Sequence, residues 1–255
     1  MKKLLSVMLV LAFAFAAVAC NTTPAVDETA PATEEVTEEV TEPVTEEVTE
    51  EVVPEVTVMT YDEYAAAAID DEVVIETYVQ GKQSWWDNKG TFYTQDENGG
   101  YFLYEMACTE EEYNALTVGT KIRVTGFKAE WAGEVEIVDA KFEVLEGNYV
   151  AEAMDATALL GTDELINHQN KKVAFTDMTV KAIEYKNGTP GDDIYVTLAS
   201  GENDYSFCVE VYLTGTETDV YTTVGTLVEG DVVDVEAFLY WYEGANPHIT
   251  AITKK

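Results

Sequence analysis

Two aromatic residues at matching places in the sequence are the first candidates for contact with a ligand. Trp131 and Tyr242 each follow a Phe by four residues, in the stretches 126–137 and 236–251, which share a sequence pattern. An aromatic side chain at an exposed rim can stack on a nucleobase or on a sugar ring. The chemistry that this spacing predicts is therefore recognition by stacking.

Groups that could catalyse a reaction are few and scattered. The two histidines, His168 and His248, lie in different halves of the chain, and no Ser or Cys has the sequence surroundings of a nucleophile. Adjacent acids such as Asp192 and Asp193 are expected by chance in a chain with 49 Asp and Glu residues. We therefore expect no enzymatic activity.

Metal ligands show no recognisable spacing either. Histidines and cysteines lack the intervals of a zinc site. The segment from Asp96 to Asn98 has two of the side chains of a calcium loop, but the Gly and the final Glu of an EF-hand are missing. We expect a hairpin turn there, and no metal or cofactor.

An internal repeat organises the second part of the chain. A shift of 111 residues superposes a pattern of Leu, Gly, Val or Ile and aromatic positions in two segments. The aligned pairs are Leu116 with Leu227, Gly119 with Gly230, Ile122 with Val233, Val124 with Val235, Phe127 with Phe238, Trp131 with Tyr242 and Gly133 with Gly244. Two copies of one module are the simplest explanation.

Each copy has the composition of β structure. In the first copy, runs rich in Val, Ile, Tyr and Phe predict five strands, at 72–80, 90–95, 101–107, 120–127 and 134–145. Residues 193–213 predict a hairpin in the second copy. Thr109 and Glu112 form a capping box, which predicts a short helix between the third and fourth strands. Short helices at 59–70 and 155–169 are expected to lead into the first strand of each copy.

This order of elements resembles the OB-fold, and in particular the OB modules of secreted bacterial proteins. The residues that carry the resemblance are Tyr93, Gln95, Asp96, Gly99, Leu116, Gly119, Ile122, Val124 and Gly126. The resemblance implies a mainly β protein with two tandem five-stranded OB-like barrels, at 58–147 and 148–255. It does not specify a ligand, because one fold serves many functions.

Several aromatic residues of the first copy are candidates for the same binding surface. Trp85 and Trp86 lie where the resemblance places the loop between the first two strands, a common contact loop of OB barrels. Neighbouring residues point in opposite directions, so one of them should be buried and the other exposed. Tyr93 and Tyr101 are further candidates. Phe127 and Phe238 are expected to fill the barrels, and Gly133 and Gly244 to form turns between the last two strands.

The N-terminus has the features of a secretory signal. Lys2 and Lys3 precede an apolar run, and small residues then lead to Cys20. The segment 17–20, Ala-Val-Ala-Cys, resembles the lipobox of bacterial lipoproteins, although Ala17 stands where Leu is more usual. The resemblance implies that Cys20 is acylated and anchors the protein on the outer side of the cytoplasmic membrane. Plain secretion after cleavage by an ordinary signal peptidase is the alternative.

Residues 21–57 are predicted to be a disordered acidic linker. They contain neither Lys nor Arg, and they repeat the sequence Thr-Glu-Glu-Val. Repulsion between Glu side chains and the absence of aromatic residues leave nothing to offset the loss of conformational entropy on ordering.

Charge argues against nucleic acid as the ligand. Without the twelve acids of the linker and the two lysines of the signal, 37 acidic residues face 12 Lys and Arg residues, a formal charge of −25. Binding to phosphates depends on Lys and Arg, and the few basic residues form no stripe.

These observations favour a non-catalytic module that binds an oligosaccharide or a protein partner. The rival hypothesis is a structural or assembly role in the cell envelope, in which the aromatic residues are simply core. Cys108 and Cys208 fall one in each copy, and two buried thiols are expected rather than a disulfide.

Overall fold

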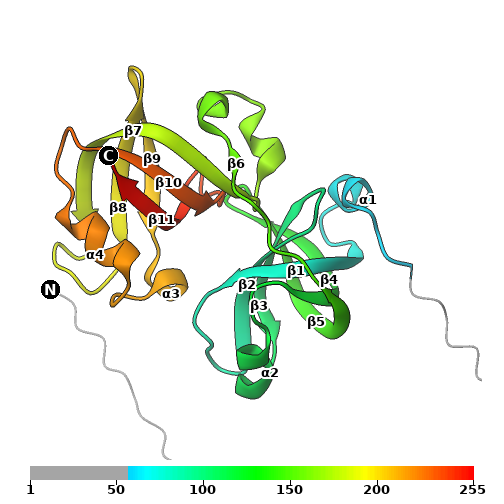
Figure 1. The fold of residues 1–255 in the computed structure, drawn as a ribbon. Coiled ribbons are helices and arrows are strands. Elements are labelled where there is room, and N and C mark those ends of the chain that lie inside the picture. The colour runs from blue at the N-terminus through cyan, green and yellow to red at the C-terminus, as the bar shows by residue number, and fades with distance from the viewer. Residues whose placement is uncertain (1–56) are drawn as a thin grey trace, which may run out of the picture. The chain divides into compact units, whose positions relative to one another are not determined.

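The structure is a computed structural model that describes residues 57–255. The predicted signal, the predicted acylation site Cys20 and the predicted linker up to residue 56 lie outside the described residues. The chain is mainly β, as predicted, with one closed five-stranded barrel and a second sheet (Figure 1). No helix within residues 57–255 is long and apolar enough to cross a bilayer.

The barrel is closed by strands in the order β1-β2-β3-β5-β4, which agrees with the OB-like expectation. Its strands are β1 (Glu72–Lys82), β2 (Lys89–Gln95), β3 (Gly100–Ala107), β4 (Thr120–Trp131) and β5 (Glu134–Asn148). All five predicted strands are present, and β4 and β5 run a few residues further than predicted. Alternate residues fill the interior, including Ile75, Phe92, Leu103, Ile122 and Ile137.

Two short helices flank the barrel, and capping boxes begin both. In α1 (Tyr61–Ala66) the Thr60 side chain accepts a hydrogen bond from the backbone of Glu63, and the Glu63 carboxylate accepts one in return. Thr109 and Glu112 make the same exchange at α2 (Glu110–Ala115), as their sequence predicts. The predicted turn at Asp96 is also confirmed, since its Oδ1 accepts hydrogen bonds from the backbones of Asn98 and Gly99.

A buried lysine holds the C-terminal end of α1 against the barrel. Lys128, on β4, is 6% exposed. Its Nζ donates hydrogen bonds to the carbonyl oxygens of Tyr64, Ala65 and Ala67 at 3.0, 2.9 and 2.8 Å. The Tyr64 carbonyl also accepts a bond from the backbone of Ala67 at 3.2 Å, and the ammonium group supplies donors to carbonyls at the helix end that the short helix itself cannot.

The second sheet has the order β10-β11-β9-β8-β7-β6, and β10 also pairs with β7. Its strands are β6 (Met154–Asp155), β7 (Lys172–Tyr185), β8 (Ile194–Ser200), β9 (Asn203–Val209), β10 (Val232–Phe238) and β11 (His248–Lys254). The pairing order β7-β8-β9-β11-β10, which returns to β7, therefore matches the order β1-β2-β3-β5-β4 of the first barrel. The parallel pair β9–β11 corresponds to β3–β5.

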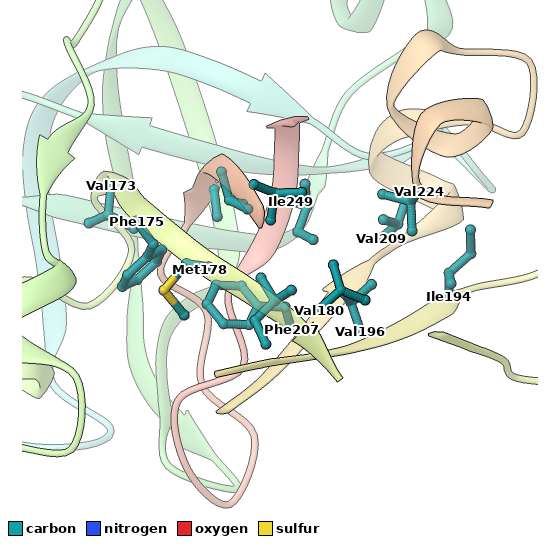
Figure 2. Close-up of a cluster of buried hydrophobic side chains, with 14 of the residues drawn as sticks. Val173, Phe175, Met178, Val180, Ile194, Val196, Phe207, Val209, Val224 and Ile249 are labelled. Carbon is teal, nitrogen blue, oxygen red and sulfur yellow. The ribbon is translucent and has the colours of Figure 1, made fainter. Parts of the chain in front are cut away.

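Short helices complete the second half. Two 3-10 turns, η1 (Thr157–Leu159) and η2 (Leu165–His168), stand where one short helix is predicted. Two α-helices, α3 (Val211–Thr214) and α4 (Asp219–Thr226), lie between β9 and β10. The core of this half is a separate cluster of buried side chains that includes Phe175, Met178, Val196 and Phe207 (Figure 2).

A third cluster joins the two halves, and it corrects one prediction. Phe238 does not fill a barrel: it is 3% exposed and packs with Tyr93 and Phe102 of the first half. The rings of Tyr93 and Phe238 are stacked, with centroids 4.3 Å apart and planes at 5°. Phe127, its counterpart in the repeat, is 42% exposed, so the prediction that it fills the first barrel is wrong.

Polar contacts support the same junction. Gln95 Oε1 accepts a hydrogen bond from the backbone of Lys172 at 2.7 Å, and Gln169 Nε2 donates to the carbonyl of Gly133 at 2.8 Å. Gly100 lies so close to the backbone of Asn170 that any Cβ at this position would collide with it. Tyr93 and Gln95, two residues of the pattern that resembles OB modules, thus contact the second half of this chain.

Candidate functional site

Three adjoining hollows line the region where the two halves meet. Their volumes are 520, 310 and 550 Å³. The first and the central hollow share Gln83 and Tyr104 as lining residues. The central and the third share Trp131, Tyr240 and other residues. Because neighbouring hollows have common walls, we treat them as one groove.

Exposed aromatic side chains lie along the groove. Trp131 and Tyr242 are 55% and 47% exposed, as predicted for both, and their ring centroids are 5.2 Å apart. Trp131 is the last residue of β4, before the turn to β5, and Tyr242 lies in the loop between β10 and β11. Gly133 and Gly244 in these turns have positive φ, as expected. The backbone N–H of Glu243 also donates to the carbonyl of Ala132 at 2.7 Å, which holds the two loops together.

The first hollow contains the tryptophan pair. Trp86 is 71% exposed, whereas Trp85 packs against the barrel core and donates its indole N–H to the carbonyl of Cys108 at 3.0 Å. The two tryptophans thus differ in exposure in the predicted direction, but Trp85 is half-buried rather than buried. Both line the hollow together with Tyr212, which is 63% exposed and was missed by the sequence reasoning.

Two predicted contact residues are not available to a ligand. Tyr93 has no exposed surface, because it is covered by Phe238 and its hydroxyl lies 2.8 Å from Nδ1 of His248. Tyr101 is 1% exposed and packs edge-on against Tyr61 and Tyr64. Both predictions are wrong, since strand alternation gives the face of a residue but not what covers that face.

The central hollow combines rings and carboxylates. Phe102, Tyr104, Trp131 and Tyr240 provide the rings, and Glu136 and Glu210 provide the carboxylates. Burial raises the pKa of Glu210 to about 7, and Asp193 adds to the rise. Burial also raises the pKa of Glu136, with Glu105 as a second cause. The Glu210 carboxylate accepts a hydrogen bond from Gln83 at 2.9 Å.

His248 lies on the wall shared by the central and third hollows. Burial lowers its pKa to about 3, so the ring is neutral in ordinary buffers. Tyr93 keeps its proton because burial raises its pKa, and its hydroxyl shares a hydrogen bond of 2.8 Å with Nδ1 of His248. The ring stacks on Tyr240 at a centroid distance of 4.3 Å. These contacts make His248 a fixed part of the wall.

A second buried acid lies at the same junction. Glu134 has no exposed surface, and burial raises its pKa to about 8. Its Oε2 accepts hydrogen bonds from the backbone of Trp241 at 2.8 Å and from Gln169 at 3.2 Å. It thus connects β5 of the first half to the residue that follows Tyr240.

The basic residues at the two ends of the groove are already paired. Lys89 contacts Glu105 at 2.7 Å in the first hollow, and Lys186 contacts Asp193 at 2.9 Å in the third. A carboxylate partner therefore offsets part of the positive charge of each ammonium group.

Two further groups that could react are buried thiols. Cys108 and Cys208 are both free, as expected, and burial raises the pKa of both thiols, that of Cys108 to about 11. A raised pKa makes a thiol a poor nucleophile near neutral pH. Within residues 57–255, no group of three or more His, Cys, Asp and Glu residues is arranged to hold a metal ion.

Seven lining residues of the central hollow were not predicted as contact residues: Gln83, Phe102, Tyr104, Glu136, Glu210, Tyr240 and His248. Tyr240 is two residues before Tyr242, and that interval was the one available signal. The two acids could not be singled out, because acidic residues occur throughout the chain.

No protein-family model and no curated protein matches the sequence. Among solved structures, a murine DNA-binding protein bound to double-stranded DNA is 9% identical, over 71% of this chain and 94% of its own, with a TM-score of 0.36. The p202 HIN1 domain bound to a 12-mer of double-stranded DNA is 12% identical, over 74% and 96% of the two chains, with a TM-score of 0.34. A chain of the Replication Protein A heterotrimer bound to single-stranded DNA is 11% identical, over 75% and 51%, with a TM-score of 0.31. Similarity at this level carries no inference about what the present chain binds.

Proposed function

We propose that this chain is a non-catalytic binding protein that holds an oligosaccharide in the groove between its two halves. The observation that supports this most is the continuity of the groove. Exposed rings at Trp86, Tyr212, Trp131 and Tyr242 lie along hollows that share walls. Separate aromatic platforms suit separate contacts, whereas a continuous row suits a chain-like ligand.

The composition of the groove fits a sugar chain better than a nucleic acid. Aromatic faces can stack on sugar rings, and carboxylate and amide groups such as Glu210 and Gln83 can bind hydroxyl groups. The same carboxylates would repel phosphates. The exposure of the rings also argues against a purely structural role, in which they would be core.

The proposal includes a second OB-like barrel in the second half. Support comes from the pairing cycle β7-β8-β9-β11-β10, which returns to β7 in the order followed by the first barrel. It further includes anchoring by acylated Cys20, supported by the signal-like N-terminus and the residues before Cys20.

A glycan array with the full-length protein tests the binding function. The expected result is selective binding to one class of oligosaccharide, weakened about tenfold or more in Trp131→Ala and in Tyr242→Ala, since each loses a stacking face. Phe127→Ala is the matched control, because Phe127 is an exposed aromatic residue outside the groove. It should bind as the wild type does.

Three outcomes would contradict the proposal. If binding survives the loss of both Trp131 and Tyr242, the binding site lies outside this part of the groove. Salt-sensitive retention on single-stranded DNA would favour nucleic acid instead. Absence of glycan binding together with crosslinking to an envelope protein would favour the assembly role.

Detergent phase partitioning tests the anchor separately. The wild-type protein expressed in a bacterium should enter the detergent phase and incorporate labelled fatty acid, whereas Cys20→Ala should do neither. Equal partitioning of the two proteins into the aqueous phase would point to plain secretion.

A further inference from the structure

The central hollow differs from the two outer hollows in which charged residues line it beside its carboxylates. Neither Lys nor Arg is among the residues that line it, whereas each of the outer hollows contains a lysine. Four of its lining residues are aromatic, and two are glutamates. Its walls are therefore negative and rich in π faces.

Glu136 is the more unusual of the two glutamates. It is 8% exposed and lines the hollow. Within residues 57–255 its carboxylate has neither a hydrogen-bond donor nor an ion-pair partner. Partial loss of water around a carboxylate without a partner disfavours its charged form. A cation that entered the hollow would offset that effect.

The aromatic walls define what kind of cation fits. Tyr240 lies between Phe102, at a centroid distance of 5.3 Å, and His248, at 4.3 Å. The faces of such rings attract organic cations. A divalent metal ion instead requires several oxygen ligands around one point, and a hollow of 310 Å³ with two carboxylates does not supply them.

We infer that the central hollow binds an organic ammonium group, and that on the oligosaccharide this group is the free amine of an amino sugar. The choice of sugar rests on the function proposed above, whereas the ammonium site itself does not. Glu136 and Glu210 provide the opposite charge, and Trp131, Tyr104 and Tyr240 provide the π faces. The exposed rings of the outer hollows would then hold the neighbouring sugar units.

Isothermal titration of the full-length protein with choline and with 3,3-dimethylbutan-1-ol tests the ammonium site. The two molecules have the same shape, and only choline is charged. We expect choline to bind at least tenfold more tightly. Equal affinity for the two, or binding of neither, would overturn the inference, even if an oligosaccharide without amines binds elsewhere in the groove.

Variants of the two glutamates place the site. At pH 8, above the pKa of about 7 of Glu210, Glu136→Gln and Glu210→Gln should each weaken choline binding about tenfold, because each removes negative charge from the walls. Glu143→Gln is the matched control: Glu143 is on the same strand as Glu136, its side chain is 70% exposed, and it does not line the hollow. If Glu136→Gln and Glu210→Gln bind choline as Glu143→Gln does, the site is not in this hollow.

A second titration tests the sugar. Glucosamine should bind more tightly than N-acetylglucosamine, because acetylation removes the charge of the amine. Binding of choline without this preference would overturn the amino-sugar assignment. A preference for glucosamine in the wild type that is lost in Glu136→Gln supports it.

Discussion

The two halves of the molecule use equivalent residues for different purposes. Phe127 and Phe238 occupy the same place in the repeat, yet the first is 42% exposed and the second is 3% exposed. The difference arises from the neighbours, because the first half covers Phe238 with Tyr93 and Phe102, whereas nothing comparable covers Phe127. The repeat thus determines strand pairing, and contact between the halves determines what each strand face does.

The loops between the last two strands show the opposite behaviour. Trp131 and Tyr242 are also equivalent, and both remain exposed, close together and on one groove. One pair of equivalent aromatics has therefore diverged in exposure, and the other lies along one groove. Variants can test each side of this comparison.

The largest difference is expected between the two phenylalanines. Phe238→Ala should lower the free energy of unfolding by about 3–5 kcal/mol, because it leaves a cavity beside Tyr93. Phe127→Ala should change it by only about 0.5 kcal/mol, as for other exposed positions. Urea unfolding curves measure both. Similar losses for the two variants would remove the basis of the comparison.

The second difference concerns a buried acid of the first half and a buried base of the second. Burial raises the pKa of Glu134 from 4.5 to about 8 and lowers that of His248 from 6.5 to about 3. Between pH 4.5 and 8 the folded protein keeps a proton at Glu134 that the unfolded chain releases, so stability falls as pH rises. Between pH 3 and 6.5 the unfolded chain takes up a proton that His248 refuses, so stability rises with pH.

The two effects oppose each other below pH 6.5, so we expect the wild type to lose stability mainly from there to pH 8. The slope from Glu134 is at most about 1.4 kcal/mol per pH unit. In Glu134→Gln the fall of the free energy of unfolding with pH should become shallower. The slope that remains is attributed to Glu210. Other groups near these two residues are Glu136, Asp193, Tyr93 and Tyr240. Urea unfolding at several pH values, with Glu143→Gln as the control, measures the change; an unchanged slope would mean that Glu134 is ionised in the fold.

A smaller effect is expected from the paired loops. A double-mutant cycle with Trp131→Ala and Tyr242→Ala should give a coupling of about 0.5–1.5 kcal/mol in the free energy of unfolding, as for other aromatic pairs. Additive losses would mean that the two rings do not stabilise the contact between the halves.

The smallest effect distinguishes the helices that precede β4 and β10. The capping box of α2 has hydrogen bonds in both directions, whereas at α4 only the Thr218 side chain accepts one, from Tyr221 at 3.4 Å. Thr109→Ala should therefore cost about 1 kcal/mol and Thr218→Ala less. Thermal unfolding compares the two, and a larger loss for Thr218→Ala would reverse the ranking.

Local features were predictable because short segments determine them. The capping box of α2 required only Thr109 and Glu112. The closed barrel and the exposure of Trp131 followed from strand order and loop position. Tyr93 and Tyr101 were assigned wrongly because the residues that cover them, such as Phe238 and Tyr61, are distant in sequence. Glu136 and Glu210 became candidates only when folding brought them beside the rings.

The hydrogen bonds of Lys128 have a mechanical consequence. Tension that enters the described chain from its N-terminal side meets α1 first and β1 next. To unravel the end of α1, such a pull must break the bonds from one ammonium group to three carbonyl oxygens and expose a charge held in the interior. Through Lys128, part of the tension on α1 is transmitted to β4, so the barrel as well as the helix resists it.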